Sequence, residues 1–286
     1  MILKENRRYG YLKHAALFLW AFFTTAFAFA GRVDTVNIYS HAMKQNLKCV
    51  VVTPTVYDGQ KTFPVVYLLH GYSGSYNNWI KRVPDITNYA DEYQLIIVCP
   101  EGGYSSWYFD SPVDDSLRYE TFIAREVPAF IDSRYKTIAS REGRAITGLS
   151  MGGHGGLFLA WKYAGFFGAA GSMSGALDLE PYKAKYQMTD ILGDTLNNKL
   201  YTDWSVVNMY KAKPAMPLSL IVDCGTADPF ISSNRQLHTE LINLNVEHDY
   251  IERNGGHNWA YWQNALPYQL LFFHRYFTNK EGSPST

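Results

Sequence analysis

The sequence has 286 residues, of which 47% are hydrophobic, 16% aromatic and 18% charged, and its formal net charge at pH 7 is +0. A chain of this length and composition is long enough to bury a full hydrophobic core, and it lacks the low hydrophobicity of a disordered chain. A balanced charge gives no electrostatic footprint for nucleic acid, so we expect no nucleic-acid partner.

The first thirty residues have the pattern of a secretory signal peptide. A basic leader precedes an apolar run, Ala15–Phe29, and small residues precede a cleavage point after Ala30. The run is too short for a comfortable membrane span of about 20 residues. We therefore expect residues 1–30 to be removed, leaving a single domain over 31–286 that is exported to the periplasm or the medium without stable membrane insertion. An uncleaved amino-terminal anchor is the alternative.

The three cysteines, Cys49, Cys99 and Cys224, lie in or beside apolar, strand-like runs. An odd number in such surroundings favours buried free thiols over a disulfide framework, with one pairing among the three as the alternative.

Apolar runs alternating with amphipathic ones predict an α/β fold, with a mostly parallel central sheet and helices on both faces. The predicted strands are Val36–Tyr39, Leu47–Thr53, Pro64–Leu69, Leu95–Val98, Arg144–Thr147, Phe167–Met173, Leu218–Val222 and Glu247–Glu252. The first two are close enough in sequence to pair antiparallel. A long amphipathic helix is predicted over about 115–135.

The segment Gly148-Leu149-Ser150-Met151-Gly152 lies between a predicted strand and an apolar, helix-like run. A serine with glycines two positions before and after it, on a strand-to-helix turn, is typical of a nucleophile elbow. The backbone of such a turn is strained, and a side chain at either glycine would collide with it. The alternative is a glycine-rich turn that merely contains a serine.

A second glycine-rich loop, His70–Ser75, follows the strand that ends at Leu69. In a serine hydrolase, a loop in this place supplies one oxyanion-hole N–H, and the residue after the nucleophile supplies the other. We assign these donors to the backbones of Tyr72 and Met151. We expect His70 to tie down its loop rather than to take part in the chemistry.

Two later loops add a carboxylate and an imidazole after successive strands. Asp223 and Asp228 follow one strand and His257 follows the next, so that the chain order is Ser, Asp, His, as in α/β-hydrolases. His257 would take the proton of Ser150, and a buried carboxylate would fix its tautomer. We favour Asp228, which reaches further over the sheet edge than Asp223, the alternative.

Two segments are expected to surround this centre, the loop Tyr104–Asp110 and a cap-like insertion over about 176–217. They supply three candidate substrate-binding residues, Trp107, Tyr108 and Trp204, whose flat apolar faces suit a phenolic ring or a sugar. Packing under a lid is the alternative. Neither segment has a metal-ligand cluster or a phosphate loop, so we expect a reaction without metal or cofactor.

Four ordered motifs resemble those of the esterase D-like family: Leu69-His70-Gly71, Gly148–Gly153, Cys224–Asp228 and Gly256–Trp259. That family includes S-formylglutathione hydrolases, feruloyl and acetylxylan esterases, tributyrin esterases and mycolyltransferases. The resemblance extends from about Val36 to Phe277. One departure is Asn258, where several relatives have Asp, but this is not a triad position.

The resemblance implies Ser150, Asp228 and His257 as a catalytic triad, with the Tyr72 and Met151 amides as oxyanion hole. It does not fix the substrate. The signal peptide disfavours the cytosolic formaldehyde-detoxifying members and favours the exported feruloyl and acetyl esterases.

The sequence therefore predicts a secreted serine esterase acting on short acyl or aryl esters of small molecules or carbohydrates. The alternatives are a general short-chain carboxylesterase, an S-formylglutathione hydrolase-like thioesterase, an acyltransferase with the same triad, and a non-catalytic binding module.

Overall fold

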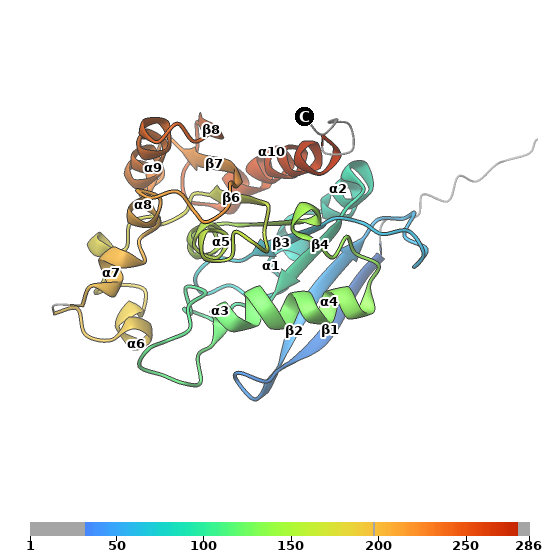
Figure 1. The fold of residues 1–286 in the computed structure, drawn as a ribbon, viewed down its shortest axis with the longest axis horizontal. Helices are drawn as coiled ribbons and strands as arrows, with labels where there is room; N and C mark the ends of the chain where they lie inside the picture. Colours follow the sequence, from blue (N-terminus) through green and yellow to red (C-terminus); the bar gives the residue numbers. More distant parts are fainter. Residues whose placement is uncertain (1–31, 197, 280–286) are drawn as a thin grey trace, which may run out of the picture.

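The computed structural model describes residues 32–196 and 198–279, in which eight strands form one sheet in the order β1-β2-β4-β3-β5-β6-β7-β8 (Figure 1). The strands are β1 (Arg32–Ser40), β2 (Gln45–Thr53), β3 (Val65–Leu69), β4 (Ile96–Pro100), β5 (Arg144–Gly148), β6 (Ala169–Met173), β7 (Ser219–Gly225) and β8 (His248–Arg253). Strand β2 pairs antiparallel with β1 and β4, and every other neighbouring pair is parallel. This is the mostly parallel sheet of an α/β-hydrolase, as predicted. The expected signal peptide lies outside the described residues.

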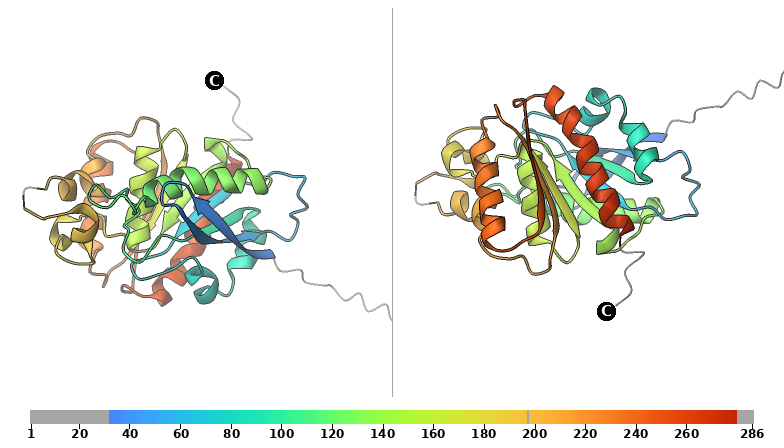
Figure 2. Two further views of the ribbon diagram at one scale, coloured as in Figure 1. Left: turned by 90° about the horizontal axis from the view of Figure 1, so that it is seen from below. Right: turned by 90° about the horizontal axis from the view of Figure 1, so that it is seen from above.

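Helices cover both faces of the sheet. They are α1 (Asn78–Arg82), α2 (Ile86–Tyr93), α3 (Tyr119–Thr121), α4 (Val127–Arg134), α5 (Met151–Lys162), α6 (Met188–Leu192), α7 (Leu200–Asp203), α8 (Val206–Met209), α9 (Ile231–Asn243) and α10 (Trp259–Thr278). Figure 2 shows α10 and α2 crossing one face and α4 crossing the other. The side chains of α1, α2 and α10 pack in one core cluster, and those of α4, α5 and α9 pack in the other.

The two cores follow from the alternation of side chains along the strands. In β3, Val65, Tyr67 and Leu69 face the core beneath α5, whereas Val66 and Leu68 face the core beneath α10. All five side chains are fully buried. A strand that is covered on both faces has apolar residues at every position. The positions of the central strands could therefore be predicted from continuous apolar runs in the sequence.

The long helix and one strand differ from the sequence predictions. The segment predicted as one helix over 115–135 becomes helical only at Tyr119, and a π-helical turn (Phe122–Glu126) separates α3 from α4. The wider turn lies just before Pro128, whose ring cannot fit an ordinary helix interior and which has no N–H to donate. Strand β6 begins at Ala169 rather than Phe167, because the Phe167 N–H bonds to the Tyr163 carbonyl at the end of the α5 region.

The insertion over 176–217 contains a 3₁₀ turn (Glu180–Tyr182) and the short helices α6, α7 and α8. Figure 1 shows α6 and α7 at one end of the molecule, away from the β1–β2 hairpin. Several hydrogen bonds join the insertion to the rest of the domain. Two of them involve α5: the His154 ring bonds to the Trp204 carbonyl at 2.9 Å, and the Tyr210 hydroxyl donates to the Leu157 carbonyl at 3.1 Å. The Ser111 hydroxyl donates to the Ile191 carbonyl at 2.6 Å. The insertion is thus anchored on the helix that follows the elbow.

Within the described residues, no helix is long and apolar enough to cross a membrane, and no group of three or more His, Cys, Asp or Glu side chains is arranged to hold a metal ion. The three cysteines, all in that part of the chain, are buried and unpaired.

Candidate active site

Ser150 lies on a sharp turn between β5 and α5. Its backbone has φ 55° and ψ −117°, a conformation that is costly for a residue with a Cβ. The flanking glycines make the turn possible. A Cβ at Gly148 would come 2.6 Å from the Gly152 carbonyl oxygen, and one at Gly152 would come 2.5 Å from the His70 carbonyl oxygen. The predicted steric reason for the two glycines is therefore present in the structure.

Three side chains meet at the carboxyl edge of the sheet. The Ser150 Oγ lies 2.9 Å from His257 Nε2, and His257 Nδ1 lies 2.9 Å from Asp228 Oδ2. The second carboxylate oxygen of Asp228 accepts the backbone N–H of Phe230 at 2.9 Å. With Nδ1–H donated to Asp228, the Nε2 lone pair faces the serine hydroxyl, which is the orientation of a general base.

Asp223, near the end of β7, does not contact His257 and bonds to other side chains. It is fully buried, and its carboxylate accepts the Tyr261 hydroxyl and the Arg253 guanidinium. Burial raises the pKa of Asp223, while the bonds from Tyr261 and Arg253 act in the opposite direction. Of the two competing carboxylates, the structure brings only Asp228 to His257.

The two amides expected to bind an oxyanion flank Ser150. Met151 is the first residue of α5, and Tyr72 lies in the loop after β3, where a Cβ on the neighbouring Gly71 would come 3.3 Å from the Ser150 Cβ. In the described part of the chain, neither the Tyr72 nor the Met151 backbone N–H donates a hydrogen bond. Two free N–H groups beside a serine, one at a helix N-terminus, suit a developing negative charge.

The predicted structural role of His70 agrees with its contacts. The ring is buried, accepts the Gly102 N–H at Nε2 (2.8 Å), and lies 2.8 Å from the Gly71 carbonyl oxygen through Nδ1. It therefore links the loop after β3 to the loop after β4 and holds the Tyr72 amide in place.

A pocket of about 570 Å³ opens over Ser150 and His257. Its walls come from the loops after β3, β4, β7 and β8, from α1 and from the insertion, as expected at the carboxyl ends of parallel strands. Most of the larger lining side chains are aromatic: Tyr72, Trp107, Tyr186, Phe230, Trp259 and Trp262.

The sequence prediction missed several of these aromatic residues. Phe230 and Trp262 stand edge-on to the His257 ring, each with its centroid 4.9 Å away, and so restrict the rotation of the imidazole. Their closeness in sequence to Asp228 and His257 was the one available signal. Tyr186 comes from the insertion, and nothing local in the sequence marks it as a lining residue.

Of the three aromatic residues predicted to bind substrate, the structure places only Trp107 on the pocket wall. Tyr108 is fully buried, and its hydroxyl donates to the His70 carbonyl at 2.8 Å. Trp204 packs instead against Phe109 and Phe158, with ring centroids 4.9 and 5.7 Å away. The expectation for Tyr108 and Trp204 is therefore corrected: Tyr108 is enclosed beneath the site, and Trp204, which is half-buried, does not line this pocket.

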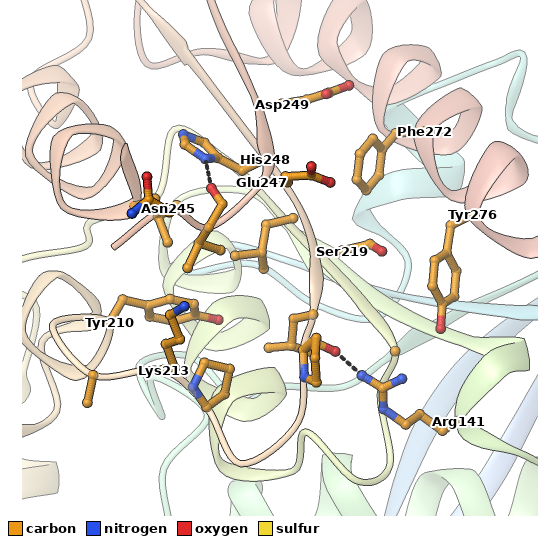
Figure 3. A pocket seen from close by; sticks show the side chains of 18 of the residues that line it. Arg141, Tyr210, Lys213, Ser219, Asn245, Glu247, His248, Asp249, Phe272 and Tyr276 are labelled. Atoms are coloured by element: carbon orange, nitrogen blue, oxygen red, sulfur yellow. Dashed lines mark hydrogen bonds between the residues drawn. The ribbon is translucent and has the colours of Figure 1, made fainter. Parts of the chain in front are cut away.

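A second cavity, of about 880 Å³, lies at the opposite edge of the sheet, near the amino ends of β7 and β8 (Figure 3). Arg141 and His248 lie on its walls, but each is already bonded to a backbone carbonyl, Arg141 to Pro217 and His248 to Val246. Among the described residues that line this cavity, none is Ser150, Asp228 or His257. It is therefore separate from the candidate active site.

The fold and the elbow serine define a hydrolase of the α/β-hydrolase fold. Residues 40–273 match the model of the esterase family, and the chain belongs to that family. It is 28% identical over 254 residues to an acetyl esterase of Caldicellulosiruptor saccharolyticus, covering 81% of this chain and 94% of that protein.

Two further comparisons agree with this assignment. The chain is 27% identical over 276 residues to the diacylglycerol acyltransferase/mycolyltransferase Ag85B of Mycobacterium leprae, covering 82% of this chain and 81% of that protein. Among solved structures it is similar to a ferulic acid esterase, with a TM-score of 0.76 and 27% identity over 87% of this chain and 99% of the other.

Proposed function

We propose that this chain is a serine carboxylic-ester hydrolase that cleaves short acyl or aryl esters through an acyl-enzyme on Ser150. One observation carries the proposal: the continuous hydrogen-bonded line from Ser150 Oγ through His257 to Asp228, with both donor–acceptor distances at 2.9 Å. A strained serine on an elbow has no use in a module that only binds.

The geometry supports a two-step reaction. His257 Nε2 takes the hydroxyl proton as Ser150 Oγ attacks the ester carbonyl, and the carbonyl oxygen becomes an oxyanion facing the Tyr72 and Met151 N–H groups. His257 then gives its proton to the leaving alkoxide, which departs as the alcohol. A water molecule then loses a proton to His257 and attacks the acyl carbon. The bond between the acyl carbon and Ser150 Oγ breaks, and His257 returns the proton to Oγ as the acid leaves. Asp228 stabilises the imidazolium throughout.

The pocket supports a small or flat acyl group. Its volume of about 570 Å³ and its aromatic walls suit a short acyl chain or a phenolic ring, and aromatic faces also pack well on sugars. The similarity to proteins named acetyl esterase and ferulic acid esterase supports the same class. We therefore take acetyl or feruloyl esters of carbohydrates as the substrates, with Trp107 on the binding wall.

A panel of esters tests this proposal. We expect p-nitrophenyl acetate and methyl ferulate to be hydrolysed with much higher kcat/KM than p-nitrophenyl palmitate, and acetylated xylan to release acetate. Highest efficiency on palmitate would contradict the proposed pocket. Activity on acetate without ferulate or xylan activity would show a general short-chain carboxylesterase instead.

A second candidate is acyl transfer to a sugar hydroxyl, favoured by the similarity to an acyltransferase over 82% of this chain. The same acyl-enzyme serves both reactions, and the acceptor decides between them. Product analysis with p-nitrophenyl acetate, with and without a sugar, distinguishes them: an acetylated sugar shows transfer, and free acetate alone shows hydrolysis.

We also propose that the protein is exported, on the basis of the basic leader, the apolar run and the small residues before Gly31. Amino-terminal sequencing of the protein from a producing cell tests this proposal. A mature chain beginning at Gly31 is expected, and a retained Met1 in the cytoplasmic fraction would contradict it.

A further inference from the structure

The polar side chains on the wall of the active-site pocket include one positive charge and two amide groups. Arg82, Asn78 and Asn258 line the pocket, and none of the described residues that line it is acidic. Asp228 lies behind His257, and its carboxylate oxygens are taken by the His257 ring and the Phe230 N–H. The pocket therefore offers a substrate a positive charge and no negative one.

The two asparagines turn donors toward the pocket because their oxygens are already bonded. Asn78 Oδ1 accepts the Ser75 N–H at 2.7 Å, which stabilises the loop before α1. Asn258 Oδ1 accepts the Tyr261 N–H at 3.1 Å and so caps α10. Within the described residues, neither Nδ2 group has an acceptor, so each remains able to donate to a ligand.

Arg82 carries the charge of this group. It is exposed on the last turn of α1, and in the described part of the chain its guanidinium forms no ion pair. The guanidinium lies 6.0 Å from the centre of the Trp259 ring, another pocket residue, and this cation–π contact favours a position over the pocket wall. The indole N–H of Trp262, on the same wall, has no partner among the described residues.

We propose that Arg82, Asn78 and Asn258 form a subsite for a carboxylate carried by the ester substrate. A planar guanidinium with amide donors beside it suits the two oxygens of a carboxylate. This inference rests on the proposed esterase function and specifies its substrate class: esters with a negative charge in the acyl part or in the alcohol part, such as an acylated uronic acid.

Two matched pairs of substrates distinguish the source of the charge. The first pair is 4-acetoxybenzoate and its neutral methyl ester, in which the anionic member carries its charge in the leaving group. The second pair is monophenyl adipate and the neutral methyl phenyl adipate, in which the anionic member carries its charge in the acyl group. We expect the wild-type enzyme to prefer the anionic member of one pair, chiefly through a lower KM, and the pair that shows the preference locates the subsite.

Variants at Arg82 test whether this side chain recognises the negative charge of the substrate. Arg82→Gln should reduce the anionic-to-neutral ratio of kcat/KM about tenfold, as expected for one partly solvated, charge-assisted contact. Arg82→Lys should retain part of the ratio. Lys81→Gln is the matched control, because Lys81 is an exposed cation on the same helix but does not line the pocket, and it should leave the ratio unchanged. Added salt should weaken the wild-type preference.

The outcomes separate this inference from the proposed function. Hydrolysis of the neutral esters with no preference for either anionic partner would overturn the carboxylate subsite and leave the esterase intact. An equal loss of the ratio in Lys81→Gln and Arg82→Gln would also overturn it, because the effect would then be general electrostatic steering. Turnover of none of the four esters would overturn the proposed function itself.

Discussion

The elbow makes a sharp steric prediction at Gly152. An alanine Cβ there would lie 2.5 Å from the His70 carbonyl oxygen and 2.7 Å from that of Leu69, roughly 1 Å inside the distance of ordinary van der Waals contact. Both obstacles are backbone atoms, so relief requires the end of β3 and the loop after it to move. Overpacking of this kind costs about 1–3 kcal/mol.

Gly152→Ala should therefore affect both stability and activity. A loss of about 2 kcal/mol corresponds to a fall in Tm of roughly 4–8 °C for a domain of this size. The loop that must retreat carries the Tyr72 amide, and a misplacement of about 1 Å at a catalytic group costs on the order of 100-fold, which we expect in kcat/KM for p-nitrophenyl acetate.

Gly165→Ala is the matched control, because a Cβ at Gly165 meets only the Met216 sulfur, at 3.8 Å. Thermal unfolding and steady-state kinetics of the two variants check the prediction. Equal behaviour of Gly152→Ala and Gly165→Ala would refute the steric account of the elbow.

Two further predictions concern the carboxylates and a buried imidazole. Asp228→Asn should lower kcat by about 10⁴-fold through loss of tautomer control, whereas Asp223→Asn should mainly lower the free energy of unfolding, by about 3 kcal/mol, because the Arg253 charge would lose its carboxylate. Steady-state kinetics with the reverse ranking would transfer the catalytic role to Asp223. Burial lowers the pKa of His154 to about 4, so the fold favours its neutral form. The stability that neutral His154 contributes is fully present above about pH 6.5, the ordinary pKa of histidine. About 3 kcal/mol of it is lost as the pH falls toward 4. Urea unfolding of His154→Gln from pH 7 to 4 should show a flatter pH dependence than the wild type, and an equal slope would contradict the assignment.

The strands and the position of the candidate active site were predictable because their signals are local. Continuous apolar runs located β3 and β4, and the glycine spacing around Ser150 located the elbow. The order of Ser150, Asp228 and His257 along the chain then placed three loops at one sheet edge, since parallel strands end at the same edge.

The pocket walls were less predictable because long-range packing decides them. Nothing local distinguishes Trp107, which lines the pocket, from Tyr108, which points under His70. Both residues have positive φ, at 53° and 62°, so the loop backbone turns sharply between neighbouring side chains. Arg82 lies at the pocket because α1 packs against the start of α10, where the Trp79 and Trp259 rings meet edge-to-face with centroids 5.2 Å apart.

The central claim is that Ser150 is the nucleophile of an esterase. The most direct test is the turnover of p-nitrophenyl acetate by a folded Ser150→Ala protein, with thermal unfolding as the check that the fold is retained. We expect a loss of kcat on the order of 10⁶-fold, as in a related triad. Near wild-type turnover by a Ser150→Ala variant that unfolds at the wild-type temperature would contradict it.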